Sequence, residues 1–113
     1  MKFGMEKKGD VILIELRKSL EGGPDTFEIK DEVTALLAKG ERKFVLDMSA
    51  ASFVNSTGIG VVVAMQSSIT NAGGQLKICK VGDRARRAFV VTGVWALFDV
   101  YDTQEEAFKA FQG

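Results

Sequence analysis

Histidine is absent from this sequence of 113 residues, and cysteine and proline occur once each. Without histidine the chain lacks the base of Ser-His and Cys-His dyads and the commonest protein ligand of metal ions. The lone cysteine, Cys79, cannot form a disulfide within the chain, and its apolar setting in residues 75–79 indicates a buried strand. These absences argue against an enzyme, a metal site or a cofactor, and they favour a reducing compartment.

A net charge is missing as well, because the 15 basic and 15 acidic side chains cancel. No global field would therefore attract the chain to nucleic acid or to an anionic membrane. No apolar run reaches the ~18 residues of a membrane span, and residues 1–8 lack the apolar stretch of a signal peptide. We expect a cytoplasmic protein without membrane insertion that recognises its partners through local contacts.

The composition that is present is typical of a soluble globule, with 46% hydrophobic and 27% charged residues. Residues 1–113 are of the right length for a single domain. Apolar, β-branched segments bounded by turn signals predict five strands, and helical spacing of apolar residues predicts four helices. The expected strands are residues 2–7, 11–16, 43–47, 75–79 and 98–101. The helices are expected to begin at residue 25, within residues 55–58, at residue 83 and at residue 103.

The resulting order is β-β-α-β-α-β-α-β-α, in which Gly9-Asp10 closes an N-terminal hairpin. Every later strand is joined to the next through a helix, so the chain is expected to form an α/β fold with a mixed, mostly parallel sheet. Residues 61–63 are three valines, which suit a strand, but the distance between breaker residues favours a helix. Capping boxes are predicted at Asp25 with Glu28 and at Thr103 with Glu106. The helix that follows Thr103 is expected to bury Ala107, Ala110 and Phe111.

The most informative segment is Asn55-Ser56-Thr57-Gly58 at the expected start of a helix. One N-cap residue would be enough, yet three consecutive residues can serve, so the segment offers more hydroxyls than capping requires. It also follows a strand of the parallel type, and open α/β sheets carry their binding sites at the carboxyl ends of such strands. The segment is therefore the main candidate for a binding site, beside its ordinary interpretation as a helix cap.

Other motifs near this segment fail on spacing. Gly58 and Gly60 resemble part of a dinucleotide fingerprint, but Val63 occupies the place of the third small residue. Ser56 does not lie in a G-x-S-x-G elbow, and no histidine could activate it. A further cluster, Arg84-Ala-Arg-Arg87, is either a solvated helix face or a contact patch for an acidic partner.

The segments 44–49 and 53–60 together resemble the signature of STAS domains, the family of bacterial anti-sigma-factor antagonists. The likeness continues through Gly73-Gly74, residues 76–78 and residues 92–98, so it extends over nearly the whole chain. In that family one hydroxyl of an Asp-Ser-Ser/Thr-Gly motif is phosphorylated by a kinase that is also the anti-sigma factor. Ser56 and Thr57 are the matching positions.

The resemblance implies a phosphorylation-switched binding module that sequesters an anti-sigma factor serine/threonine kinase and so frees a sigma factor. A PP2C-type phosphatase is a second implied partner. The implied contact face comprises Asn55, Ser56, Thr57, Gly58 and Ile59, with Glu21 from the preceding loop. Asn55 stands where the family usually has Asp, and this difference favours an alternative, a STAS scaffold subunit of a signalling or lipid-transport assembly that binds without being phosphorylated.

Overall fold

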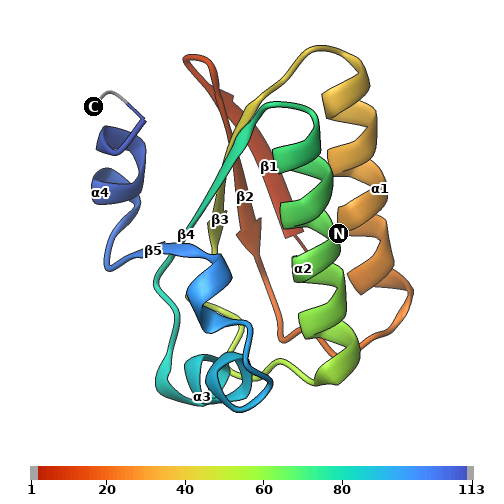
Figure 1. Ribbon diagram of the computed structural model, residues 1–113, viewed down its shortest axis with the longest axis vertical. Coiled ribbons are helices and arrows are strands. Elements are labelled where there is room, and N and C mark those ends of the chain that lie inside the picture. Colours follow the sequence, from red (N-terminus) through yellow and green to blue (C-terminus); the bar gives the residue numbers. More distant parts are fainter. Residues whose placement is uncertain (1–2, 112–113) are drawn as a thin grey trace.

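The computed structural model describes residues 3–111, which form a five-stranded sheet with helices on both faces (Figure 1). The strands lie side by side in the order in which they occur along the chain. The first is antiparallel to the second, and the others run parallel, as the sequence predicts. Lys2, predicted in the first strand, lies outside the described residues. The strands are β1 (Phe3–Lys8), β2 (Val11–Leu16), β3 (Lys43–Asp47), β4 (Gln75–Cys79) and β5 (Asp99–Tyr101).

The helices divide between the two faces of the sheet. α1 and α2 cover one face, α4 lies on the other, and α3 lies near the carboxyl ends of the parallel strands (Figure 1). The valines of residues 61–63 lie in α2, so the prediction of a helix there is confirmed. A short 3₁₀ helix, Trp95–Leu97, was not predicted. The α-helices are α1 (Pro24–Ala38), α2 (Ser56–Asn71), α3 (Asp83–Val91) and α4 (Gln104–Lys109).

The core has two parts because side chains alternate between the faces of a strand. In β3, Phe44 and Leu46 enter the large cluster beneath α1 and α2, whereas Val45 enters a smaller cluster beneath α4. Ala107 of α4 is buried in this smaller cluster, as predicted. Ala110 and Phe111, also predicted to be buried, are only partly covered because α4 ends at Lys109 and the chain begins to leave the sheet.

The helix cap predicted at Thr103 is confirmed, and Glu106 takes part in it through the Thr103 hydroxyl, where a full capping box would use the Thr103 backbone N–H. The Thr103 hydroxyl oxygen accepts a hydrogen bond from the Glu106 backbone N–H at 3.1 Å and lies 3.3 Å from the Glu106 carboxylate. This motif is encoded within four residues and needs no tertiary partner.

The capping box predicted at Asp25 and Glu28 is wrong. α1 begins at Pro24, with Gly23 as an N-cap that makes no side-chain bond. Proline favours the first helical position because its ring pre-sets φ and because it has no N–H there to satisfy. Asp25 consequently lies inside the first turn, where its carboxylate is 3.6 Å from the Lys18 ammonium.

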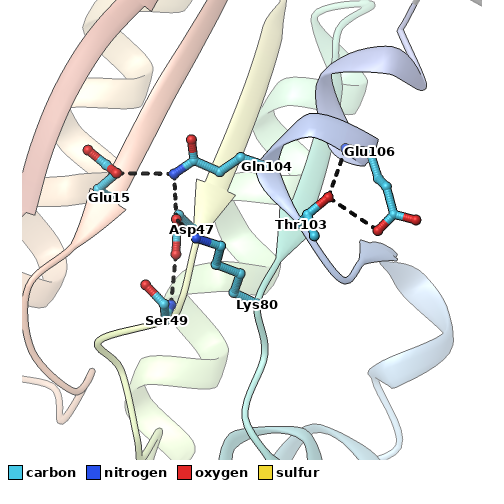
Figure 2. A network of polar contacts seen from close by, with 7 residues as sticks. All are labelled: Glu15, Asp47, Ser49, Lys80, Thr103, Gln104 and Glu106. Carbon is cyan, nitrogen blue, oxygen red and sulfur yellow. Dashed lines mark hydrogen bonds and ion pairs between the residues drawn. The ribbon is translucent and has the colours of Figure 1, made fainter.

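A buried carboxylate, Asp47 at the end of β3, connects α4 to the sheet. Figure 2 shows Gln104 reaching from α4 to a position between Glu15 and Asp47. The other Asp47 oxygen, Oδ1, accepts from the Ser49 backbone N–H at 2.8 Å. The Lys80 ammonium lies 3.8 Å from Oδ2, the oxygen that Gln104 binds. Burial alone would raise the pKa of Asp47, but the hydrogen bonds from Gln104 and Ser49 outweigh it and hold this pKa below its ordinary value.

Replacing Asp47 by asparagine is expected to lower the free energy of unfolding by about 1–2 kcal/mol at neutral pH, because an amide N–H would then face a donor. The pKa of Asp47 is lowered in the folded state, so its stabilisation is present above the unfolded pKa of about 3.9. It is lost as the pH falls through the folded value. Urea unfolding of wild type and Asp47→Asn, near neutral pH and below pH ~4, measures this difference.

Asp10→Asn is the control for this prediction, because it removes an exposed carboxylate 2.8 Å from the Lys43 ammonium. Exposed pairs contribute little, so a much smaller change is expected. Equal effects of the two substitutions at both pH values would show that the Asp47 network does not stabilise the fold.

Candidate functional site

The start of α2 lies at the carboxyl ends of the parallel strands, close to α3 (Figure 1). The segment that leads into it pairs with the loop after β2. The Leu20 N–H donates to the Phe53 carbonyl at 3.1 Å, and its carbonyl accepts from the Asn55 N–H at 3.1 Å. Leu20 and Val54 thereby form an isolated parallel bridge, and both are buried. The segment expected from sequence as a site is thus held in place by two backbone hydrogen bonds to a distant loop.

Asn55 caps α2 and also contacts the loop after β2. Its side-chain oxygen accepts from the Gly58 N–H at 2.9 Å, while its amide nitrogen donates to the Glu21 carbonyl at 2.8 Å. An aspartate could make the first bond but not the second, because a carboxylate has no proton to donate. The asparagine that departs from the family motif therefore has a structural role in this chain.

Gly58 permits the close approach of the two segments. A Cβ atom at this position would lie 2.5 Å from the Leu20 carbonyl oxygen and 2.9 Å from the Leu20 Cβ. Its backbone is helical, so the requirement for glycine comes from space rather than from φ. Any side chain here would push the start of α2 away from the loop after β2.

The two candidate hydroxyls lie next to each other in sequence but line different hollows. The α2–α3 hollow, of about 460 Å³, is formed by Ser56 with Phe53, Arg84, Arg87 and Val91. The α1–α2 hollow, of about 510 Å³, is formed by Thr57 with Phe27, Lys30, Asp31 and Gly60. Ser56 and Thr57 are both exposed, so a partner can reach either hydroxyl from its own side of α2.

The other residues predicted for the contact face differ in how much of their surface is exposed. Glu21 is exposed and lies beside Asn55, which binds its carbonyl. Gly58 and Ile59 are buried, so they shape the start of α2 and offer little surface of their own. The structure thus brings the predicted residues together, and their part in partner binding stays a prediction.

Two arginines line the candidate site as well, although the sequence indicated only that they belong to a charged cluster. Arg84 and Arg87 come from α3, and the Arg84 guanidinium lies 5.2 Å from the centre of the Phe53 ring. The charged cluster was visible in the sequence, but its contact with residues about thirty positions earlier depends on how α3 packs. Arg86 of the same cluster does not line this hollow; it lines an adjacent surface with Asp83 and Val90, which Arg87 also borders.

The single cysteine, Cys79, ends β4. Cys79 is fully buried, and burial together with the nearby Asp47 charge raises its pKa to about 12. The thiol therefore stays protonated and unreactive at neutral pH. Between residues 3 and 111, acidic and cysteine side chains do not gather in threes or more as a metal ion would need. In the same range, every helix is too short or too polar to cross a membrane.

Comparison with known proteins identifies the family. A model of the STAS domain matches residues 4–107. BtrV of Bordetella bronchiseptica, which is named as an anti-sigma factor antagonist, is 29% identical over 112 residues, or 99% of this chain and 96% of BtrV. The crystal structure of TM1081 from Thermotoga maritima, described in the same terms, has a TM-score of 0.89 at 25% identity and covers 98% of this chain and 95% of its own.

A more distant structure shares the fold. Unphosphorylated SpoIIAA, an anti-sigma factor antagonist, has a TM-score of 0.83 at 19% identity, covering 98% of this chain and 96% of SpoIIAA. The sheet order, the placement of the helices and the family match over residues 4–107 agree with one another. This chain belongs to the STAS-domain family.

Proposed function

We propose that this protein is an anti-sigma factor antagonist whose binding face surrounds the start of α2. In this proposal the unmodified protein sequesters an anti-sigma factor, a serine/threonine kinase, in the cytoplasm and so frees a sigma factor. Phosphorylation of Ser56 or Thr57 by that kinase ends the complex, and a PP2C-type phosphatase restores it. The observation that carries the proposal is the pair of exposed hydroxyls on a firmly held helix start.

A phosphate at this position would change the surface more than the fold. It adds about 1.5 to 2 negative charges near neutral pH. The N–H groups of the first helical turn lack intrahelical acceptors and carry the positive end of the helix dipole, so they stabilise an anion there. The new charge would instead disrupt a partner surface that had packed against a neutral hydroxyl.

The names of the related proteins support this proposal. BtrV and TM1081 are named as anti-sigma factor antagonists, as is a Staphylococcus aureus relative that is 28% identical over 78 residues. SpoIIAA has been solved in both phosphorylated and unphosphorylated forms.

The test is to incubate the protein with the cognate kinase-type anti-sigma factor and ATP and to measure the intact mass. Wild type is expected to gain the mass of one phosphate. One of the two variants Ser56→Ala and Thr57→Ala should abolish this gain and the other should keep it, because only one hydroxyl is the phosphoacceptor. Ser67→Ala is the matched control, since Ser67 is exposed on α2 but far from its start. Binding of phosphorylated and unmodified protein to the same kinase is then compared.

Wild type that binds this kinase but gains no phosphate mass in the presence of ATP would contradict the switch. One observation favours the alternative of a non-phosphorylated STAS scaffold subunit of a signalling or lipid-transport assembly. The residue beside the two hydroxyls is Asn55, whose amide donates to the Glu21 carbonyl. An asparagine at this position supplies no carboxylate to orient a phosphoacceptor. If the protein binds its partner without gaining the mass of a phosphate, the scaffold function is the one supported.

A further inference from the structure

The α2–α3 hollow combines an apolar wall with positive charge. Phe53, Ala88 and Val91 supply apolar surface, and Val91 is 78% exposed. Arg84 and Arg87 stand along the same wall, and none of the residues that the structure describes there is acidic. The apolar surface is contributed by several residues together and is bordered by the two guanidiniums, a combination found at protein-binding sites.

The two guanidiniums have no acidic partner among the residues that the structure describes. Within residues 3–111, neither Arg84 nor Arg87 lies within 4.0 Å of a carboxylate oxygen, although seven such pairs occur elsewhere. Arg84 is positioned by its contact with the Phe53 ring, which leaves its N–H groups available to another acceptor. The hollow therefore presents positive charge that is free to pair with an acidic group of another molecule.

We propose that the α2–α3 hollow binds a segment of the partner protein in which a carboxylate neighbours an aliphatic side chain. The carboxylate pairs with Arg84 and Arg87, because guanidinium groups bind carboxylates through two parallel hydrogen bonds. The aliphatic side chain packs against Phe53 and Val91. The identification of that partner as the anti-sigma factor rests on the proposed function, whereas the chemistry of the segment rests on the hollow.

Ser56 lines the same hollow, and this gives its hydroxyl a specific part in the interaction. A phosphate on Ser56 would stand beside the two guanidiniums and compete with the incoming carboxylate. A phosphate on Thr57 would lie in the α1–α2 hollow and leave the arginine site open. Modification of Ser56 is thus the one that would block the acidic segment directly.

The test uses a synthetic capped peptide, Glu-Leu-Glu-Leu-Glu, and its neutral counterpart, Gln-Leu-Gln-Leu-Gln. Each is titrated to millimolar concentration into the isotope-labelled protein while the NMR shifts of backbone amides and arginine Nε–H groups are followed. The acidic peptide is expected to shift signals of Ser56, Arg84, Arg87 and Val91. The double variant Arg84→Gln/Arg87→Gln should bind it at least about tenfold more weakly, the loss expected for charge-assisted pairs.

Arg86→Gln is the matched control, because it removes the same charge from the same helix outside the hollow. It is expected to bind the acidic peptide within about twofold of wild type, the difference expected from an exposed charge. All three arginines are exposed, so these variants should fold, and the NMR spectrum of each checks this.

Four results of the peptide titrations would overturn the inference, and a fifth would come from the protein without peptide. The first is that the acidic peptide causes no shifts, and the second is that the neutral peptide binds as well as the acidic one. The third is that Arg86→Gln weakens binding as much as the double variant does. The fourth is that inorganic phosphate displaces the peptide at equal concentration, which would mark a small-anion site. Concentration-dependent shifts without peptide, abolished by the double variant, would assign the hollow to a second copy of the chain and would likewise overturn it. Failure of the proposed function would be seen in a different experiment, the kinase-binding assay, in which wild type would not bind the kinase.

Discussion

Gly58→Ala is expected to lower the free energy of unfolding by about 2–3 kcal/mol, although alanine is the better helix former. The added methyl group would meet the Leu20 carbonyl oxygen at 2.5 Å and the Val54 side chain at 3.0 Å. Backbone cannot yield as a flexible side chain does, so α2 must shift. Because the Leu20 carbonyl also binds the Asn55 N–H, this shift would disturb the turn that carries Ser56 and Thr57. Urea unfolding followed by circular dichroism measures the loss.

Gly60→Ala is the matched control, two residues further along the same helix. A Cβ at Gly60 would meet nothing within 4 Å, and the residue is exposed. Alanine there should raise stability by about 0.5–1 kcal/mol, because glycine loses more backbone entropy in a helix. The two substitutions are therefore expected to have opposite signs. A stabilising Gly58→Ala would refute the close approach between α2 and the loop after β2.

Phe89→Ala is expected to cost about 3–5 kcal/mol, the range for a large aromatic side chain removed from a core. Phe89 is 1% exposed, and its ring lies 5.4 Å from that of Phe98 and 6.2 Å from that of Trp95. Only Ala85 and Phe89 of α3 are buried, so this ring provides most of the contact between α3 and the core. Thermal and urea unfolding of wild type and variant measure the effect.

Val91→Ala provides the comparison for Phe89→Ala on the same helix. Val91 is exposed, so its removal should change the free energy of unfolding by no more than about 0.5 kcal/mol. The NMR shifts of Arg84 and Arg87 should change in Phe89→Ala, because α3 would lose its fixed position beside α2. A small loss of stability in Phe89→Ala would mean that α3 is held by other contacts.

The arrangement of strands and helices could be predicted because its signals are local or periodic. The cap formed by Thr103 and Glu106 involves only four residues, and the apolar segments of β2, β3 and β4 lie between clear turn residues. The prediction at Asp25 was wrong for an equally local reason, since Pro24 takes the first helical position. Burial of Phe111 was overestimated because spacing shows which face of a helix is apolar, not how far the core extends.

The sequence by itself determined the order of the elements, indicated the STAS family and predicted the segment Asn55 to Gly58 as the candidate site. Only the tertiary structure decided that Ser56 and Thr57 serve different hollows. Successive helical residues point about 100° apart, so adjacent hydroxyls meet different neighbours. Those neighbours, α3 with its arginines on one side and α1 on the other, are placed by packing between distant parts of the chain. No local pattern encodes that packing.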